Sequence, residues 1–189
     1  PASLSRVPRA MKTKGYHIWT IGCQMNEADS RHLGSQLEAL GYRELDKPEG
    51  AEIIVLNTCV VRQQAEDKGV GKLKAVAYLK KRNPDVVLGL MGCMVGMREH
   101  KRLAEQFPYV DVFMPPSEPK PLMDYLAERA DAGDHDAAGR VDSIQRKAVQ
   151  SAVQDEEYIL PALRQGGTVC ANVPIVLGCS HACTFCIIP

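Results

Sequence analysis

The chain has 189 residues, and its 23 Lys or Arg side chains balance its 23 Asp or Glu side chains, so the formal net charge is zero. This length allows one ordinary domain, or one domain with part of another, and the balanced charge gives no support for nucleic-acid binding. No apolar run approaches the length of a membrane span, and the basic first residues lack the apolar core of a secretory signal. We therefore expect a cytoplasmic protein with no membrane association.

Three apolar segments share one pattern, because each is rich in Ile, Val and Leu and ends at a cysteine. They are HIWTIGC (17–23), EIIVLNTC (52–59) and VVLGLMGC (86–93). Continuous apolar runs of this length are typical of strands buried on both faces, and helical patterns over 27–40 and 62–82 separate them. The alternation predicts β-α-β units, and therefore an α/β fold with an open parallel sheet and flanking helices.

The same alternation continues after the third apolar segment. The sequence predicts a helix over 98–107, a strand over 110–114 and a helix near 121–130. Together these elements define one α/β domain over residues 14–130, preceded by an irregular tail at residues 1–13.

The composition changes after this domain. Residues 131–157 are acidic and contain almost no large apolar groups, so they are predicted to be a linker. A strand-like segment then leads into a cysteine-rich loop within residues 158–189. Because about thirty residues cannot supply a scaffold for such a loop, we expect this segment to be the start of a second domain and the chain to be a fragment.

The cysteine-rich loop has the spacing Cys179-x3-Cys183-x2-Cys186. Three thiolates in one short loop can bind three irons of a cubic iron–sulfur cluster and leave the fourth iron open. An open iron is what a radical S-adenosylmethionine (SAM) enzyme needs to bind SAM. A zinc site with His181 as fourth ligand is the alternative, although zinc loops usually have paired C-x2-C arms, and we favour a solvated position for His181.

Cys23, Cys59 and Cys93 form a second group, because each follows a predicted parallel strand. Each could simply be a buried thiol, which is a common use of cysteine. Parallel strands, however, place their carboxyl ends at one edge of a sheet, the edge where open α/β sheets bind ligands. Both interpretations, buried thiols or a second metal site, stay open at this point.

The neighbours of these cysteines suit a metal site. Gly22 and Gly92 would let the backbone approach a cluster closely, and Asn57 and Thr58 could form hydrogen bonds to cluster sulfides.

Several of these motifs together resemble the methylthiotransferases, a family of radical SAM enzymes. The segments that resemble the family's amino-terminal domain are GCQMNEADS (22–30), NTCVVRQQAEDK (57–68), GCM (92–94) and PYVDVF (108–113). The segment GCSHACTFCIIP (178–189) resembles the start of the family's radical SAM core, a β/α barrel. GCMVGM departs from the GCxAQ pattern common after the third cysteine, which affects the neighbours of Cys93 but not Cys93 itself.

The resemblance implies two 4Fe–4S clusters and SAM as cofactors. An auxiliary cluster would be bound by Cys23, Cys59 and Cys93. The SAM-binding cluster would be bound by Cys179, Cys183 and Cys186. Phe185 occupies a position where the family has an aromatic residue, so it either contacts the SAM adenine or packs within the loop.

The resemblance also implies a reaction and its partners. QMN and NTCxVR are most similar to family members that attach a methylthio group to C2 of N6-isopentenyladenosine at position 37 of tRNA. Members that act on threonylcarbamoyladenosine in tRNA or on ribosomal protein S12 are the alternatives. We expect tRNA as substrate, flavodoxin or ferredoxin as electron donor, a monomer, and no turnover by this chain alone.

Two other classes of protein compete with this interpretation. An iron–sulfur electron carrier usually completes each cluster with four cysteines, whereas both groups here have three. A zinc-stabilised binding module is the other alternative.

Overall fold

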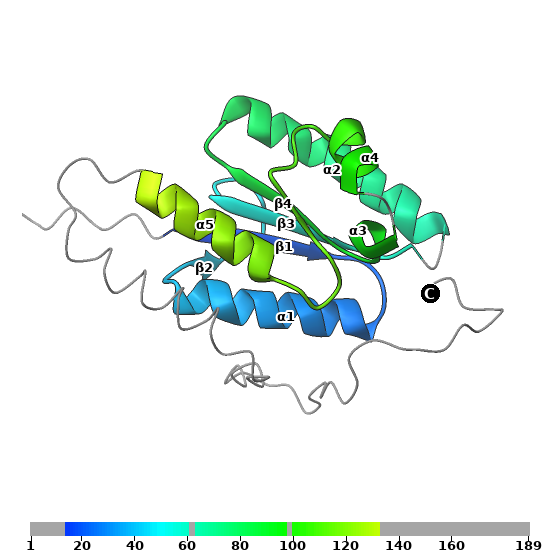
Figure 1. The fold of residues 1–189 in the computed structure, drawn as a ribbon, viewed down its shortest axis with the longest axis horizontal. Helices are drawn as coiled ribbons and strands as arrows, with labels where there is room; N and C mark the ends of the chain where they lie inside the picture. Colours follow the sequence, from blue (N-terminus) through cyan, green and yellow to red (C-terminus); the bar gives the residue numbers. More distant parts are fainter. Residues whose placement is uncertain (1–13, 61–62, 98–99, 133–189) are drawn as a thin grey trace, which may run out of the picture.

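The computed structural model describes residues 14–60, 63–97 and 100–132 (Figure 1). The predicted tail, residues 133–157 of the predicted linker, and the loop with Cys179, Cys183, Phe185 and Cys186 lie outside these residues. The first two residues of the predicted linker, 131 and 132, belong instead to the last described helix.

The described residues form a five-stranded sheet in which all neighbouring strands are parallel and the strand order is β2-β1-β3-β4-β5. The strands are β1 (Gly15–Thr20), β2 (Arg43–Glu44), β3 (Ile53–Thr58), β4 (Val87–Gly92) and β5 (Val112–Met114). The predicted open parallel sheet is therefore confirmed. The short strand β2 was not predicted, because two exposed charged residues carry no apolar pattern.

Helices cover both faces of the sheet. They are α1 (Gln24–Ala39), α2 (Gln63–Arg82), α3 (Cys93–Met97), α4 (His100–Gln106) and α5 (Lys120–Ala132). Figure 1 shows α1 and α5 on one face and α2, α3 and α4 on the other. The helix predicted over 98–107 corresponds to α4, whereas α3, which begins at the third cysteine of the amino-terminal group, was not predicted. Among the described helices, none is long and apolar enough to cross a membrane.

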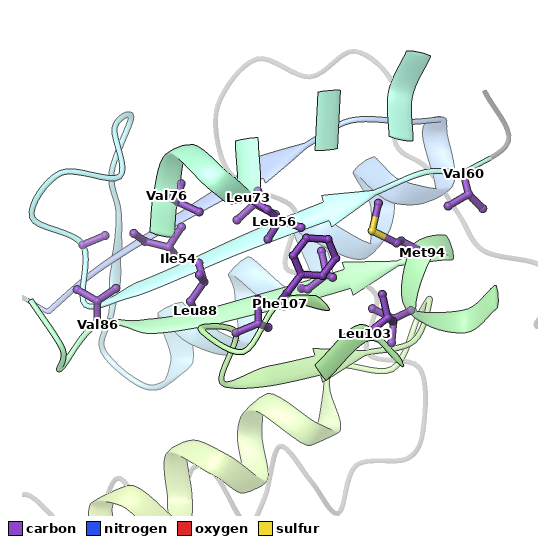
Figure 2. Packing of buried hydrophobic residues seen from close by; sticks show 14 residues of the cluster. Ile54, Leu56, Val60, Leu73, Val76, Val86, Leu88, Met94, Leu103 and Phe107 are labelled. Atoms are coloured by element: carbon purple, nitrogen blue, oxygen red, sulfur yellow. The ribbon is translucent and has the colours of Figure 1, made fainter. Parts of the chain in front are cut away.

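The alternation of side chains along β3 explains why its first four residues, 53–56, are all apolar. Ile54 and Leu56 belong to a buried cluster with residues of α2, α3 and α4, including Leu73 and Leu103 (Figure 2). The strand's other apolar side chains pack in a second cluster with α1 and α5. Because successive side chains point to opposite faces, a strand covered on both faces carries apolar residues at consecutive positions and not only at alternate ones.

The strand order places two of the cysteine-bearing segments where the order of the sheet reverses. From β1 the chain first adds β2 on one side and then returns to add β3, β4 and β5 on the other. In open parallel sheets, ligands bind beyond the carboxyl ends of the strands where the order reverses, which here lies between β1 and β3. The segments that follow these two strands carry Cys23 and Cys59.

Candidate metal centre

Cys59 and Cys93 follow directly from adjacent strands, as the sequence predicted. Thr58 of β3 is in register with Gly92 of β4, and each cysteine is the next residue in its chain segment. Cys23 differs, because β1 ends at Thr20 rather than at the cysteine. A short loop separates Cys23 from β1, and Cys23 is the N-cap of α1, so the prediction that it ends a strand was wrong. It nevertheless lies at the same edge of the sheet.

Gly22 and Gly92 have the close backbone contacts that the sequence suggested, but the contacts are with protein atoms. Both have positive φ, +154° and +101°. A Cβ on Gly22 would lie 2.9 Å from the Cβ of Cys59 and would collide with the side chain of Asn26. A Cβ on Gly92 would lie 2.5 Å from Asn57 Oδ1 and would collide with the carbonyl oxygen of Thr58. Glycine therefore lets the cysteine-bearing segments pack directly against each other.

The side chains of Asn57 and Thr58 do not have the role that the sequence suggested. The amide of Asn57 donates to the Asn26 carbonyl oxygen at 2.8 Å and to Ser30 Oγ at 2.9 Å. The hydroxyl of Thr58 donates to the Met91 carbonyl oxygen at 3.1 Å. Because their donors are satisfied inside the protein and both residues are fully buried, the hypothesis that they donate to cluster sulfides was wrong.

Asn26 is the residue of this edge that the sequence analysis missed. Its Oδ1 accepts hydrogen bonds from the backbone N–H of Cys23 at 3.1 Å and from the Cys23 thiol at 3.4 Å. Its Nδ2 donates to Asn57 Oδ1 and to the carbonyl oxygen of Thr58. Cys23 and Asn26 occupy the N-cap and third positions of α1, the spacing of a capping box, and this spacing was the available signal.

The three thiols lie in different environments, and the other two influence Cys93. Cys23 is exposed, Cys59 is buried and Cys93 is in between. Burial raises the pKa of the Cys93 thiol above its ordinary value of 9.0, and negative charge on Cys59 and on Cys23 raises it further. The influence on Cys93 is consistent with Cys59 and Cys23 lying near it, because charges separated by much more than a Debye length interact weakly.

The donor set fits an iron–sulfur cluster. Thiolates are the usual ligands of such clusters, and the part of the chain that the structure describes brings three of them to one edge of the sheet. Within the same residues, no three His, Cys, Asp or Glu side chains are arranged to hold a single metal ion. That finding concerns one ion, whereas the thiolates of a cubic cluster bind irons at separate corners and stand farther apart.

Comparison with known proteins identifies the domain. Residues 15–115 match the model of a family described as "Uncharacterized protein family UPF0004". A tRNA-2-methylthio-N(6)-dimethylallyladenosine synthase of Roseiflexus sp. (strain RS-1) is 37% identical over 179 residues, which cover 94% of this chain and 33% of that protein. The enzyme of the same name from Herpetosiphon aurantiacus is 35% identical over 180 residues, covering 95% of this chain and 36% of that protein.

A third relative of the same name, from Dehalococcoides mccartyi (strain CBDB1), is 39% identical over 176 residues, or 93% of this chain and 34% of that protein. The chain thus spans about a third of the length of the curated relatives that it matches. Because the family model covers more than half of the chain, and the relatives match nearly all of it, the chain belongs to the UPF0004 family and is related to the methylthiotransferases that its cysteine motifs resemble.

Proposed function

We propose that this chain is the amino-terminal part of a radical SAM tRNA methylthiotransferase, in which Cys23, Cys59 and Cys93 bind an auxiliary 4Fe–4S cluster. The observation that carries the proposal is the convergence of three cysteine-bearing segments at the carboxyl edge of a parallel sheet, two of them at the point where the strand order reverses. The names of the relatives support the same activity.

The second part of the proposal concerns the loop outside the described residues. Cys179, Cys183 and Cys186 bind the SAM cluster, and Phe185 contacts SAM, in line with the spacing C-x3-C-x2-C. When bound, the auxiliary cluster would supply the sulfur, and the SAM cluster would supply the electron that cleaves SAM. The protein supplies binding, orientation and shielding.

The described residues contribute to such a centre in three ways. The thiol of Cys59 is buried and that of Cys93 is partly buried, so these two ligands shield one side of the centre from water. The thiol of Cys23 is exposed and marks the side from which a substrate approaches. With three protein ligands the fourth corner stays free for a reactant, whereas an electron carrier usually closes it with a fourth cysteine.

Anaerobic reconstitution with ferrous iron and sulfide tests both metal centres. Three forms of the chain are compared: the native sequence, a variant with Cys179, Cys183 and Cys186 changed to alanine, and a variant with Cys23, Cys59 and Cys93 changed to alanine. We expect each triple variant to bind half of the iron of the native chain. Electron paramagnetic resonance (EPR) of the reduced cluster should respond to SAM only where the carboxyl-terminal group of cysteines is intact.

The alternatives give different results in the same experiment. Colourless protein with bound zinc would favour a zinc-stabilised module, and clusters that no added SAM or sulfide perturbs would favour an electron carrier. Failure of the native chain to bind any iron would overturn the proposal.

The proposed substrate is N6-isopentenyladenosine at position 37 of tRNA, methylthiolated at C2, with flavodoxin or ferredoxin as electron donor. The enzyme would act in the cytoplasm as a monomer. Expressing the complete reading frame that encodes this chain in a bacterium without its own methylthiotransferases, followed by mass spectrometry of tRNA nucleosides and of ribosomal protein S12, separates the alternatives. A methylthio group on threonylcarbamoyladenosine or on S12, and not on isopentenyladenosine, would contradict this substrate.

A further inference from the structure

We propose that Asn26 and Asn57 are positioning residues for the metal centre, because their interlocked side chains hold the segments that carry Cys23, Cys59 and Cys93 at a fixed spacing. The inference rests on the proposed function of these cysteines. It concerns two buried side chains next to the cysteine-bearing segments.

Asn26 connects the first cysteine-bearing segment to the second. Its Oδ1 accepts from the backbone N–H of Cys23 at 3.1 Å. Its Nδ2 donates to Asn57 Oδ1 at 2.9 Å and to the carbonyl oxygen of Thr58, the residue before Cys59, at 3.2 Å. One amide side chain therefore links the start of α1 to the end of β3.

Asn57 completes the reciprocal hydrogen bonding and also contacts the segment that carries Cys93. Its Nδ2 donates back to the backbone carbonyl oxygen of Asn26 at 2.8 Å, so each asparagine donates to the other. Its Oδ1 lies 2.5 Å from the position that a Cβ of Gly92 would occupy. The residue before Cys93 thus packs directly on the amide of Asn57, and the pair contacts all three segments.

The orientation of both amides is determined by their partners. Both hydrogens of Asn26 Nδ2 face oxygen acceptors, Asn57 Oδ1 and the Thr58 carbonyl oxygen, so a flipped amide would place oxygen against oxygen. Asn26 is 2% exposed and Asn57 is 0% exposed, so both amides are shielded from bulk water and depend on protein partners. Buried networks in which every group is satisfied have one arrangement, and partial loss is strongly unfavourable.

This arrangement predicts a site that is ordered before iron binds. Where ligand-bearing segments are already held in place, less binding free energy is spent on ordering them. Groups that orient metal ligands without touching the metal typically contribute about 10- to 100-fold to metal affinity. The asparagine pair therefore affects metal affinity and the spectrum of the cluster, in addition to the stability of the fold.

The test uses the chain with Cys179, Cys183 and Cys186 changed to alanine, so that only the amino-terminal group of cysteines binds iron. Asn26→Asp and Asn57→Asp keep the shape of each side chain and replace its donor by an oxygen. We expect each to lower the affinity for iron, added with sulfide under anaerobic conditions, by at least about tenfold, and to shift the EPR spectrum of the reduced cluster.

Two matched controls separate positioning from stability. Asn83→Asp makes the same chemical change at an exposed helix end. Asp111→Asn weakens a polar network at the opposite, amino-terminal edge of the sheet, where Asp111 accepts from Lys80 and from the Leu88 N–H. We expect Asp111→Asn to lower the melting temperature of the metal-free chain while the iron affinity and the EPR spectrum stay as in the parent.

A milder variant covers the case in which the aspartate variants do not fold. Ser30→Ala leaves the asparagine pair intact and removes the hydroxyl that accepts the second hydrogen of Asn57 Nδ2, together with its 2.7 Å hydrogen bond to the Thr20 hydroxyl. It should fold, lower the iron affinity by a smaller factor, and speed hydrogen exchange of the Cys23 N–H in the metal-free chain.

The outcomes distinguish this inference from the proposed function. If the parent binds no iron, the proposed function fails. If the parent binds iron and every folded Asn26, Asn57 and Ser30 variant binds it with the same affinity and spectrum, the positioning role is overturned while the metal centre stands.

Discussion

Asp29 of α1 accepts two hydrogen bonds from Ser117, one from its backbone N–H at 3.1 Å and one from its hydroxyl at 2.9 Å. Ser117 lies between β5 and α5 and has a φ of +59°, which is unusual for a residue other than glycine. The pair joins two segments that are far apart in the sequence, and Asp29 is 8% exposed. The carboxylate therefore connects α1, whose N-cap is Cys23, to the segment between β5 and α5.

The pKa of Asp29 gives a first prediction. Burial raises this pKa above the ordinary 3.8, although the hydrogen bonds from Ser117 and the charge of His32 oppose the rise. The folded state therefore binds the proton more tightly than the unfolded state, and its contribution to stability, complete below pH 3.8, is lost as the pH rises through the raised value. Relative to Asp29→Asn, which does not titrate, the free energy of unfolding of the native chain should fall over this window. Urea unfolding at a series of pH values measures the difference.

A Ser117→Ala variant serves as the control for this prediction. It removes one hydrogen bond that lowers the pKa of Asp29, so the fall in stability should extend to higher pH. A difference between the native chain and Asp29→Asn that stays constant or grows with pH would contradict the direction of the shift.

Gly92 gives a second prediction. Its φ is +101°, and a Cβ would collide with the Thr58 carbonyl oxygen and lie 2.5 Å from Asn57 Oδ1. Neither neighbour is the free end of a flexible chain, so Gly92→Ala should destabilise the chain by about 3 kcal/mol or more. Chemical denaturation followed by circular dichroism measures the effect.

Gly71 provides the matched control for this substitution. It lies within α2, and a Cβ there would meet no atom within 4 Å. Gly71→Ala should therefore stabilise the helix by up to about 1 kcal/mol. Equal stability changes for the two variants would show that the packing around Gly92 is not tight.

The sequence was sufficient to predict the sheet, because β3 and β4 are buried along their whole length and consist mostly of apolar residues. The helix α2 was predicted with nearly correct bounds, since Asn83-Pro84 follows it directly. The strand β2 could not be predicted in this way, because Arg43 and Glu44 pair only with the first residues of β1 and are exposed.

The candidate site was only partly predictable. The strand–cysteine pattern indicated that the three thiols lie at one edge, because parallel strands end on the same side. The roles of Asn57 and Thr58 were misassigned, since a sequence does not show which donors are already used inside the fold. The reciprocal hydrogen bonds between Asn26 and Asn57 join residues on different elements, so they become visible only in the folded chain.

The ion pair of Lys80 and Asp111 gives a third prediction. Lys80 Nζ lies 2.7 Å from Asp111 Oδ2, and both side chains are 19% exposed. Asp111 also accepts from the backbone N–H of Leu88 at 2.8 Å, and Lys80 donates to the Val86 carbonyl oxygen. Asp111→Ala should destabilise the chain by about 1–3 kcal/mol, because it leaves a half-buried ammonium and a backbone N–H without this acceptor.

Lys80→Met separates the two parts of that effect. It keeps the hydrogen bond between Asp111 and Leu88, so its destabilisation should be smaller and should depend less on salt concentration. Urea unfolding at low and high salt measures both variants. A larger loss for Lys80→Met than for Asp111→Ala would show that the cation, and not the shared acceptor, dominates.

The thiol of Cys93 gives a fourth prediction, made for the metal-free chain. Burial, followed by the charges of Cys59, Cys23 and Asp29, raises the pKa of Cys93 above 9.0. Only the thiolate reacts with iodoacetamide, so the midpoint of the alkylation rate against pH should lie above that of an unstructured cysteine peptide. Mass spectrometry of the labelled peptide follows Cys93 by itself.

The midpoint, and not the absolute rate, carries this test, because partial burial slows the reaction at every pH. Cys59→Ser removes the neighbouring charge with the largest effect and should move the midpoint of Cys93 to lower pH. If the midpoint stays in place in Cys59→Ser, then Cys59 and Cys93 do not interact in solution. In that case the convergence of the cysteine-bearing segments, on which the proposed metal centre depends, would be absent from the folded chain.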